Sequence, residues 1–325
     1  MSELVSILIP CYNGERWIAQ AIESALAQTW TPKEVIVVDD GSTDRSLEVI
    51  RSFEDRIQNE AGTHRGGNGA RNRLLELARG EWVQYLDADD YLLPAKIAQQ
   101  MEFLASHPDY DVVFGPITLE YWSEQGAHRK LLPIPEPHDL WVLLASWQLP
   151  QTGAPIWRKE AIRSVGGWKR DQPCCQEHEI YLRLIVGGKR FGYCPASGAV
   201  YRKWSDGTVC RRDIAEVHRR RLAIEQAAEE HLRATQQLTP KRLRAINQAR
   251  FETARSAWQY DPAFARRILR EVRETDPQFR PLGPAAPVAY RLAFNWLGFE
   301  TAETLAATKR KAARYCFPPP LTQLH

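Results

Sequence analysis

The chain has 325 residues, of which 44% are hydrophobic and 26% charged. This composition excludes a disordered or fibrous protein and is typical of one large soluble domain with an appendage, or of two domains. The net charge of +3 creates no global field that would require a nucleic-acid partner, so we expect none.

The N-terminal part alternates apolar runs of strand length with segments of helical periodicity. Strands are predicted at 5–10 and 35–39 and near Ile57, with helices at 17–26 and around 47–53. Ser42 and Thr43 are candidate caps for the second of these helices. Strands that alternate with helices predict a parallel sheet with right-handed crossovers.

Two of the predicted strands end in carboxylates. Val35–Val38 is followed by Asp39 and Asp40, and the strand at 82–86 is followed by Asp87, Ala88, Asp89 and Asp90. In open α/β sheets, ligands bind outside the carboxyl ends of the strands, so both acidic ends are expected to face one pocket. Oxygen ligands of this kind suit Mg²⁺ or Mn²⁺. The alternative is an acidic turn, although a turn needs fewer than three carboxylates.

The middle of the chain is more mixed. Gly62–Gly69 is expected to be a glycine-rich loop, followed by a helix at 70–78 that Gly80 would end as a C-cap. Further helices are predicted at 94–106, 139–145 and 176–186, and further strands at 110–119, 154–158, 190–194 and 199–203.

From residue 213 onward the pattern is helical. Helices are predicted at 213–235, 240–258 and 261–274, and a last amphipathic segment at 288–314. The last segment combines aromatic residues with Lys and Arg, but it is too short and too interrupted to span a bilayer. Two interpretations stay open: a helix that lies at an anionic membrane surface, and a helix docked on the protein's own core or on a partner subunit.

Two further features bear on location. The six cysteines follow neither a zinc pattern nor a disulfide framework, which favours reduced thiols in the cytosol. The N-terminus lacks the basic region of a signal peptide, and no run reaches the length of a membrane span. We therefore expect a cytoplasmic protein, with peripheral contact to the inner face of the membrane through the C-terminal region as an open alternative.

Five blocks in order resemble glycosyltransferase family 2. They are Val5–Asn13, Val37–Asp44, Gly66–Asn72, Leu86–Asp90, and Gly166–Trp168 followed by Glu177–Arg183. The resemblance implies a GT-A fold, a Rossmann-like and mostly parallel sheet with flanking helices, over residues 1–212. Its nucleotide-sugar half would cover about 1–93 and its acceptor half about 94–212. The helical region at 213–325 lies outside the resemblance.

The resemblance implies an inverting hexosyltransferase-type enzyme with a nucleotide-sugar donor and Mn²⁺ or Mg²⁺ in a DxD motif. A UDP-sugar is favoured on family grounds. Tyr12, Asp39 and Arg71 would hold the nucleoside, Asp87 would lie near the ribose, and Asp89 would ligate the metal. Glu177 falls where the family has its catalytic base. The implied donor-binding set is completed by four more residues, Pro10, Asn13, Asp40 and Ala88.

Two positions depart from the family pattern. Trp204 follows Tyr201-Arg202-Lys203 where the family often has a histidine, and the usual Glu-Asp pair is Gln176-Glu177. The second change keeps a carboxylate but lengthens its reach. Without the family position, Glu177 would be a solvated helix residue, and Glu179 with Arg183 a surface ion pair.

The sequence therefore favours a metal-dependent glycosyltransferase that acts on a growing surface glycan or lipid-linked acceptor, as in polysaccharide biosynthesis. A non-catalytic glycan-binding or scaffold protein on the same fold is one alternative. A sugar nucleotidyltransferase is another, but it needs a basic glycine-rich loop after the first strand, and Cys11–Glu15 is not one.

Overall fold

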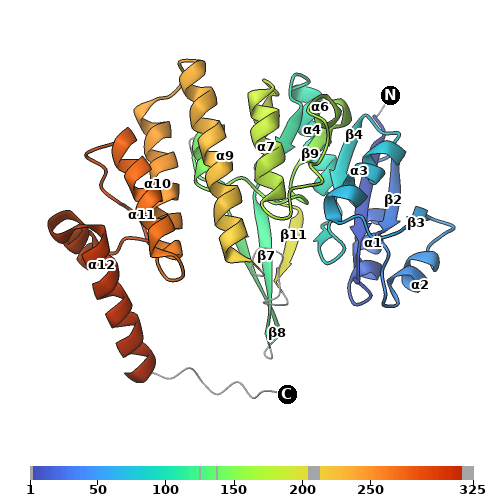
Figure 1. The fold of residues 1–325 in the computed structure, drawn as a ribbon. Helices are drawn as coiled ribbons and strands as arrows, with labels where there is room; N and C mark the ends of the chain where they lie inside the picture. Colours follow the sequence, from blue (N-terminus) through green and yellow to red (C-terminus); the bar gives the residue numbers. More distant parts are fainter. Residues whose placement is uncertain (1–2, 124–125, 137, 204–212, 317–325) are drawn as a thin grey trace. The chain divides into compact units, whose positions relative to one another are not determined.

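The computed structural model describes residues 3–123, 126–136, 138–203 and 213–316 (Figure 1). The chain forms two compact units, the first ending at Ile224 and the second beginning at Glu225. The boundary falls inside helix α9 (Ile214–Ala234), a little beyond the predicted position at residue 212. The first unit is mixed α/β and the second is helical, which is the predicted fold class.

A mostly parallel sheet forms the centre of the first unit. Its seven strands lie in the order β10 (Phe191–Tyr193), β6 (Val112–Phe114), β9 (Ile156–Arg158), β4 (Trp82–Tyr85), β1 (Val5–Cys11), β2 (Lys33–Asp39) and β3 (Gln58–Ala61). Only β9 runs antiparallel to its neighbours. Because β2 and β4 flank β1 and run parallel to it, their acidic ends emerge at the same edge.

In the described part of the chain before α9, seven helices connect and cover these strands. They are α1 (Ile18–Leu26), α2 (Ser46–Arg51), α3 (Gly67–Leu77), α4 (Lys96–Ser106), α5 (Leu140–Ala145), α6 (Lys159–Ser164) and α7 (Gln176–Val186). The core between them is fully apolar where β1 meets α1, since Ile7, Ile9, Ile18 and Ile22 are all 0% exposed. Burial on both faces explains why β1 and β2 have continuous apolar runs and why β4 is apolar except for Gln84.

A second, four-stranded sheet has the order β5 (Tyr91–Leu92), β11 (Ala199–Lys203), β7 (Ile117–Ser123) and β8 (Gly126–Leu132). The single strand predicted at 110–119 is wrong, because β6 and β7 belong to different sheets. The break comes at Gly115, where an added Cβ would lie 2.4 Å from the carbonyl oxygen of Cys194. β8 is exposed along nearly its whole length, so it has no apolar alternation that could predict it.

Three local predictions in the N-terminal half are also wrong. α3 begins at Gly67, so the end of the glycine-rich segment is helical. α2 begins at Ser46, and Asp44 rather than Ser42 or Thr43 accepts the backbone N–H of Ser46, at 2.9 Å. Gly80 is not the C-cap of α3, which ends in an extended residue, Ala78.

The second unit contains α10 (Pro240–Ala257), α11 (Pro262–Thr275) and α12 (Val288–Cys316). Thr239 and Asp261 cap α10 and α11, and each precedes a proline in the first turn of its helix. α12 is broken at Gly298, whose φ of 82° is outside the helical region. Phe251 on α10 is 0% exposed and packs against Phe279, Phe294 and Phe299.

Gly80 is needed because the chain passes close to the start of β1. A Cβ at this position would lie 2.6 Å from the Leu4 carbonyl oxygen and 2.8 Å from the Ser6 nitrogen. We therefore expect Gly80→Ala to lower the free energy of unfolding by about 1–3 kcal/mol in a urea titration. The matched control is Gly62→Ala, where nothing lies within 4 Å of the added Cβ. Equal stability of the two variants would contradict this account.

Candidate active site

The acidic end of β2 is held by backbone donors. Asp39 is 2% exposed, and its Oδ2 accepts the Ser42 N–H at 3.1 Å. Oδ1 of Asp39 is buried without a hydrogen-bond partner in the described part of the chain. Asp40 Oδ1 accepts the Arg65 N–H at 2.7 Å. A buried carboxylate oxygen that lacks a donor is suited to receive one from a ligand.

An exposed aromatic pair lies beside this strand end. Tyr12 is 48% exposed, and its ring centroid lies 4.2 Å from that of His64. His64 Nδ1 is 2.9 Å from Oδ2 of Asp40. His64 was not predicted from the sequence, because its contacts with Tyr12 and Asp40 join segments that are distant along the chain. The pair offers a planar surface on which a nucleobase could stack.

Asn13 and Pro10 shape the turn that carries Tyr12. Asn13 has a φ of 51°, and its Oδ1 accepts the Thr43 N–H at 2.8 Å. Its own N–H donates to Ser42 Oγ at 3.0 Å. Pro10 is half-buried and lies in register with Val38 of β2. Both residues therefore fix the loop after β1 against the loop after β2.

The acidic end of β4 is compact. Asp87 and Asp89 are half-buried, Ala88 packs against the core, and Asp90 is 5% exposed. Burial, and then the charges of Asp89 and Asp87, raise the pKa of Asp90 well above its usual range. No group of three His, Cys, Asp or Glu side chains with metal-site geometry occurs among the described residues. The usual Mg²⁺ site has one or two carboxylates, with the rest of its ligands from phosphate and water, and a single carboxylate such as Asp89 fits it.

Arg202 supports the backbone of this acidic loop. Its Nη1 donates to the Asp89 carbonyl oxygen at 2.6 Å, and its N–H to Asp90 Oδ1 at 2.8 Å. The guanidinium lies over the Trp17 ring at 4.1 Å and is 3.4 Å from Glu120. This role was not predicted, because the family pattern directs attention to the position of Trp204, where the family often has a histidine. Trp204 lies outside the described residues.

Glu120 in turn is fixed by several donors. Burial would raise the pKa of Glu120, but hydrogen bonds from Tyr91, Arg129 and Trp122 hold it down to about 2. The Tyr91 hydroxyl donates to Glu120 Oε2 at 2.6 Å. Charged and hydrogen-bonded side chains of the second sheet thus support the acidic loop.

Arg71 connects the acidic loop to α7. It is 7% exposed, and its Nη2 donates to Asp87 Oδ1 at 2.9 Å while Nη1 donates to Gln176 Oε1 at 2.8 Å. Burial opposes the charge, but Asp87 and Glu177 raise the pKa of Arg71 above its usual value. The guanidinium therefore lies within electrostatic reach of both carboxylates, which come from distant parts of the sequence.

Glu177 lies in the first turn of α7 and is half-buried. Thr152 is fully buried, and its Oγ1 donates to Glu177 Oε1 at 2.7 Å. The hydroxyl fixes one oxygen of the carboxylate. Thr152 is a second residue that was not predicted, since one threonine in a loop carries no pattern.

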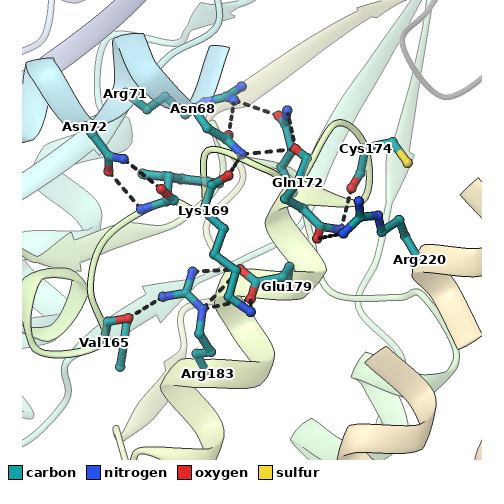
Figure 2. Close-up of polar contacts among 12 residues, drawn as sticks. Asn68, Arg71, Asn72, Val165, Lys169, Gln172, Cys174, Glu179, Arg183 and Arg220 are labelled. Atoms are coloured by element: carbon teal, nitrogen blue, oxygen red, sulfur yellow. Dashed lines mark hydrogen bonds and ion pairs between the residues drawn. The ribbon is translucent and has the colours of Figure 1, made fainter. Parts of the chain in front are cut away.

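Glu179 is not part of a surface ion pair. It is 5% exposed, and its carboxylate lies 2.6 Å from Arg183 Nη2 and 2.7 Å from Lys169 Nζ (Figure 2). Arg183 also donates to the Val165 carbonyl oxygen. The prediction of a surface ion pair is wrong because Glu179 lies on the buried face of α7, within the first unit. Glu179 is therefore a structural carboxylate that ties α7 to the loop before it.

The glycine blocks of the sequence meet in this region. Asn72 on α3 exchanges two hydrogen bonds with the backbone of Trp168, at 2.7 and 2.8 Å (Figure 2). Gly167 has a φ of 70°, and an added Cβ would lie 2.6 Å from Asn72 Oδ1. Asn68 Nδ2 donates to the Lys169 carbonyl oxygen at 2.6 Å. The 166–172 loop is thus docked on α3, next to Arg71.

Comparisons with known proteins agree with this geometry. The family model described as "Glycosyl transferase family 2" matches residues 6–165. The putative glycosyltransferase EpsE of Bacillus subtilis is 30% identical over 218 residues, which cover 64% of this chain and 75% of that protein. The chain belongs to glycosyltransferase family 2.

Another family relative has a more specific name. It is the Escherichia coli UDP-Glc:alpha-D-GlcNAc-diphosphoundecaprenol beta-1,3-glucosyltransferase WfaP, 40% identical over 104 residues. That match covers 31% of this chain and 41% of WfaP, so this chain spans about two fifths of that relative's length.

Solved structures confirm the GT-A fold. S. aureus TarS 1–349 in complex with UDP-GlcNAc superposes with a TM-score of 0.65 at 14% identity, covering 95% of this chain and 92% of that one. The mannosyltransferase PcManGT from Pyrobaculum calidifontis, in complex with GDP-Man and Mn²⁺, has a TM-score of 0.52 at 19% identity, covering 98% and 88%. At these identities the likeness concerns the fold.

Next to Glu177, the side chain of His178 is part of a stack with Trp147 and Arg221. The Trp147 ring stacks on His178 at 4.1 Å and lies beneath the Arg221 guanidinium at 4.2 Å. Burial and then the charge of Arg221 lower the pKa of His178 to about 3. His178 is therefore neutral in the folded protein, whereas it takes up a proton below pH 6.5 when the chain unfolds.

This difference predicts a pH dependence of stability. A folded pKa below the unfolded one favours folding at pH 7, and the contribution is lost as pH falls below 6.5 toward 3. His178 should add a slope of about 1.4 kcal/mol per pH unit in that window. We expect His178→Phe to flatten the pH dependence of urea unfolding between pH 7 and pH 5 by about this amount. An unchanged slope would contradict the lowered pKa of His178 in the folded protein.

Proposed function

We propose that this protein is an inverting, metal-dependent glycosyltransferase that moves a sugar from a nucleotide donor to an acceptor hydroxyl. The observation that carries the proposal is the pairing of buried Arg71 with Asp87, within electrostatic reach of Glu177. Arg71 thus connects the Asp87–Asp90 loop, which is suited to bind a metal-diphosphate group, with Glu177, whose carboxylate is suited to remove a proton. Membership of glycosyltransferase family 2 supports the same reaction class.

The donor would bind at the carboxyl edge of β1, β2 and β4. Tyr12 with His64 would stack on the base, and the free oxygen of Asp39 would accept a base N–H. Asp40, Asn13 and Pro10 would hold these loops in place. Ala88 is small enough to lie against Gly14, where an added Cβ would come within 3.4 Å of the Ala88 methyl group. A UDP-sugar is favoured, since TarS and WfaP are named with UDP-sugars.

Asp89 would hold Mn²⁺ or Mg²⁺, with Asp87 near the ribose. When bound, such an ion neutralises the charge that develops on the diphosphate leaving group. PcManGT, which shares the fold, is described with Mn²⁺. Arg202 would act as a positioning residue here, because it donates to the backbone carbonyl oxygen of Asp89.

Glu177 would act as the general base. The acceptor oxygen attacks the anomeric carbon, the bond to the diphosphate oxygen breaks, and Glu177 takes the acceptor proton. Attack opposite the leaving group inverts the anomeric centre. Thr152 would orient the carboxylate by its 2.7 Å hydrogen bond, leaving the other oxygen for the proton.

The acceptor we propose is a growing surface glycan or a lipid-linked sugar at the cytoplasmic face of the membrane. The name of WfaP includes a diphosphoundecaprenol-linked sugar. No helix in the described ranges combines the length and hydropathy needed to cross a bilayer.

Asp89→Asn should weaken metal-dependent donor binding. Replacing the carboxylate removes the main metal ligand and relieves repulsion with Asp87 and Asp90. We expect UDP affinity in Mn²⁺, measured by calorimetry, to fall at least about tenfold, to the level measured with EDTA. The control is Asp109→Asn, whose side chain is 69% exposed. Unchanged Mn²⁺-dependent affinity in Asp89→Asn would remove the metal assignment.

Glu177→Gln should bind UDP normally and lose turnover. The amide keeps the size and the hydrogen bond from Thr152 but cannot accept a proton, so kcat should fall about 10²–10⁴-fold. The assay follows released nucleoside diphosphate with a donor and acceptor panel. Glu160→Gln, on the exposed face of α6, is the control. A parallel loss of binding and turnover would make Glu177 a binding residue instead.

A further inference from the structure

The first part of α12 has an apolar face that is open to solvent. Val288, Leu292, Trp296 and Leu297 are 63%, 55%, 83% and 58% exposed. Positions 288, 292 and 296 follow one another at i,i+4 spacing, and 289, 293 and 297 lie beside them on the same side of the helix. All six of these residues are apolar. Scattered exposed apolar residues are ordinary, but a continuous face of this kind marks an interaction surface.

The opposite face of the helix is firmly docked within the second unit. Tyr290 and Phe294 are 7% and 1% exposed and pack against Phe251. Past the break at Gly298, buried Glu303 forms an ion pair with Arg255 at 2.5 Å. The exposed face is therefore not the result of an undocked helix. Docking on the core and an open outer face occur together, so the two interpretations from the sequence do not exclude each other.

The charge of this unit indicates what the face would contact. From Glu225 to the end, the sequence has 16 Lys and Arg against 10 Asp and Glu, whereas residues 1–224 have 27 against 30. The last turns of α12 contain Lys309, Arg310, Lys311 and Arg314. An exposed Trp next to aliphatic side chains, on a basic unit, is the composition of a surface that binds an anionic bilayer.

We propose that the outer face of α12, formed by Val288, Ala289, Leu292, Ala293, Trp296 and Leu297, docks on an anionic lipid surface. Trp296 and Leu292 insert at the headgroup level, and the net positive charge of the second unit attracts acidic headgroups. The inference does not depend on the proposed glycosyl transfer, since lipid binding is measured without donor or acceptor.

Deleting the chain from Pro287 onward is a poor test, because it removes Tyr290, Phe294 and Phe299 from the core of the second unit. Leu292→Gln/Trp296→Gln changes only exposed side chains and should leave the melting temperature unchanged. The matched control is Leu131→Gln on β8, since Leu131 is 53% exposed. The probe is flotation of the full chain with phosphatidylcholine vesicles that contain 30% phosphatidylglycerol, and with pure phosphatidylcholine vesicles.

We expect the unchanged protein and Leu131→Gln to float with the anionic vesicles, and 0.5 M NaCl to reduce this binding. The double variant should partition at least tenfold more weakly. Equal flotation of the double variant and the unchanged protein would overturn the proposal. A second result would also overturn the proposal: the unchanged protein does not float but forms a dimer, and the double variant is a monomer. The outer face of α12 would then bind a second copy of the chain.

Discussion

The buried guanidinium of Arg71 is the interaction on which the site depends. A cation that is 7% exposed is costly unless it is paired, and here Asp87 lies 2.9 Å away with Glu177 as a second compensating charge. The pairing requires α3, the end of β4 and the start of α7 to meet at one point. Asn72 and Gly167 bring the 166–172 loop to the same place. Compensation of the Arg71 charge thus requires the acidic loop after β4 and the start of α7 to lie close together.

The second sheet has a complementary role. Arg202 donates to the Asp89 carbonyl oxygen and to the Asp90 carboxylate, and Glu120 pairs with its guanidinium. The carboxylate of Asp87 faces Arg71 instead. Three aspartates so close together repel one another, and the raised pKa of Asp90 reflects this repulsion together with burial. The loop is therefore prepared for a cation and held in place by neutral and positive donors. The residues that would bind the cation therefore differ from Arg202, which holds them in place.

The sequence predicted what depends on local pattern. The buried strands β1, β2 and β4, the helix α7 and strand β11 followed from periodicity, because burial on one or both faces selects apolar residues. β8 was missed because it is exposed, and β6 and β7 were merged because a close backbone approach at Gly115 has no periodic signal. Thr152, His64 and Arg202 depend on contacts between distant segments. Single polar residues do not show such contacts until the chain is folded.

The central claim is that a nucleoside diphosphate and its metal lie between the acidic loop and α7. The most direct measurement is a crystal structure with UDP and Mn²⁺. The account predicts the uracil on the exposed ring of Tyr12, Asp89 as a direct ligand of the metal, and the diphosphate on the same side as Glu177. A nucleotide bound away from the carboxyl edge of β1, β2 and β4, or a metal held without Asp89, would contradict it.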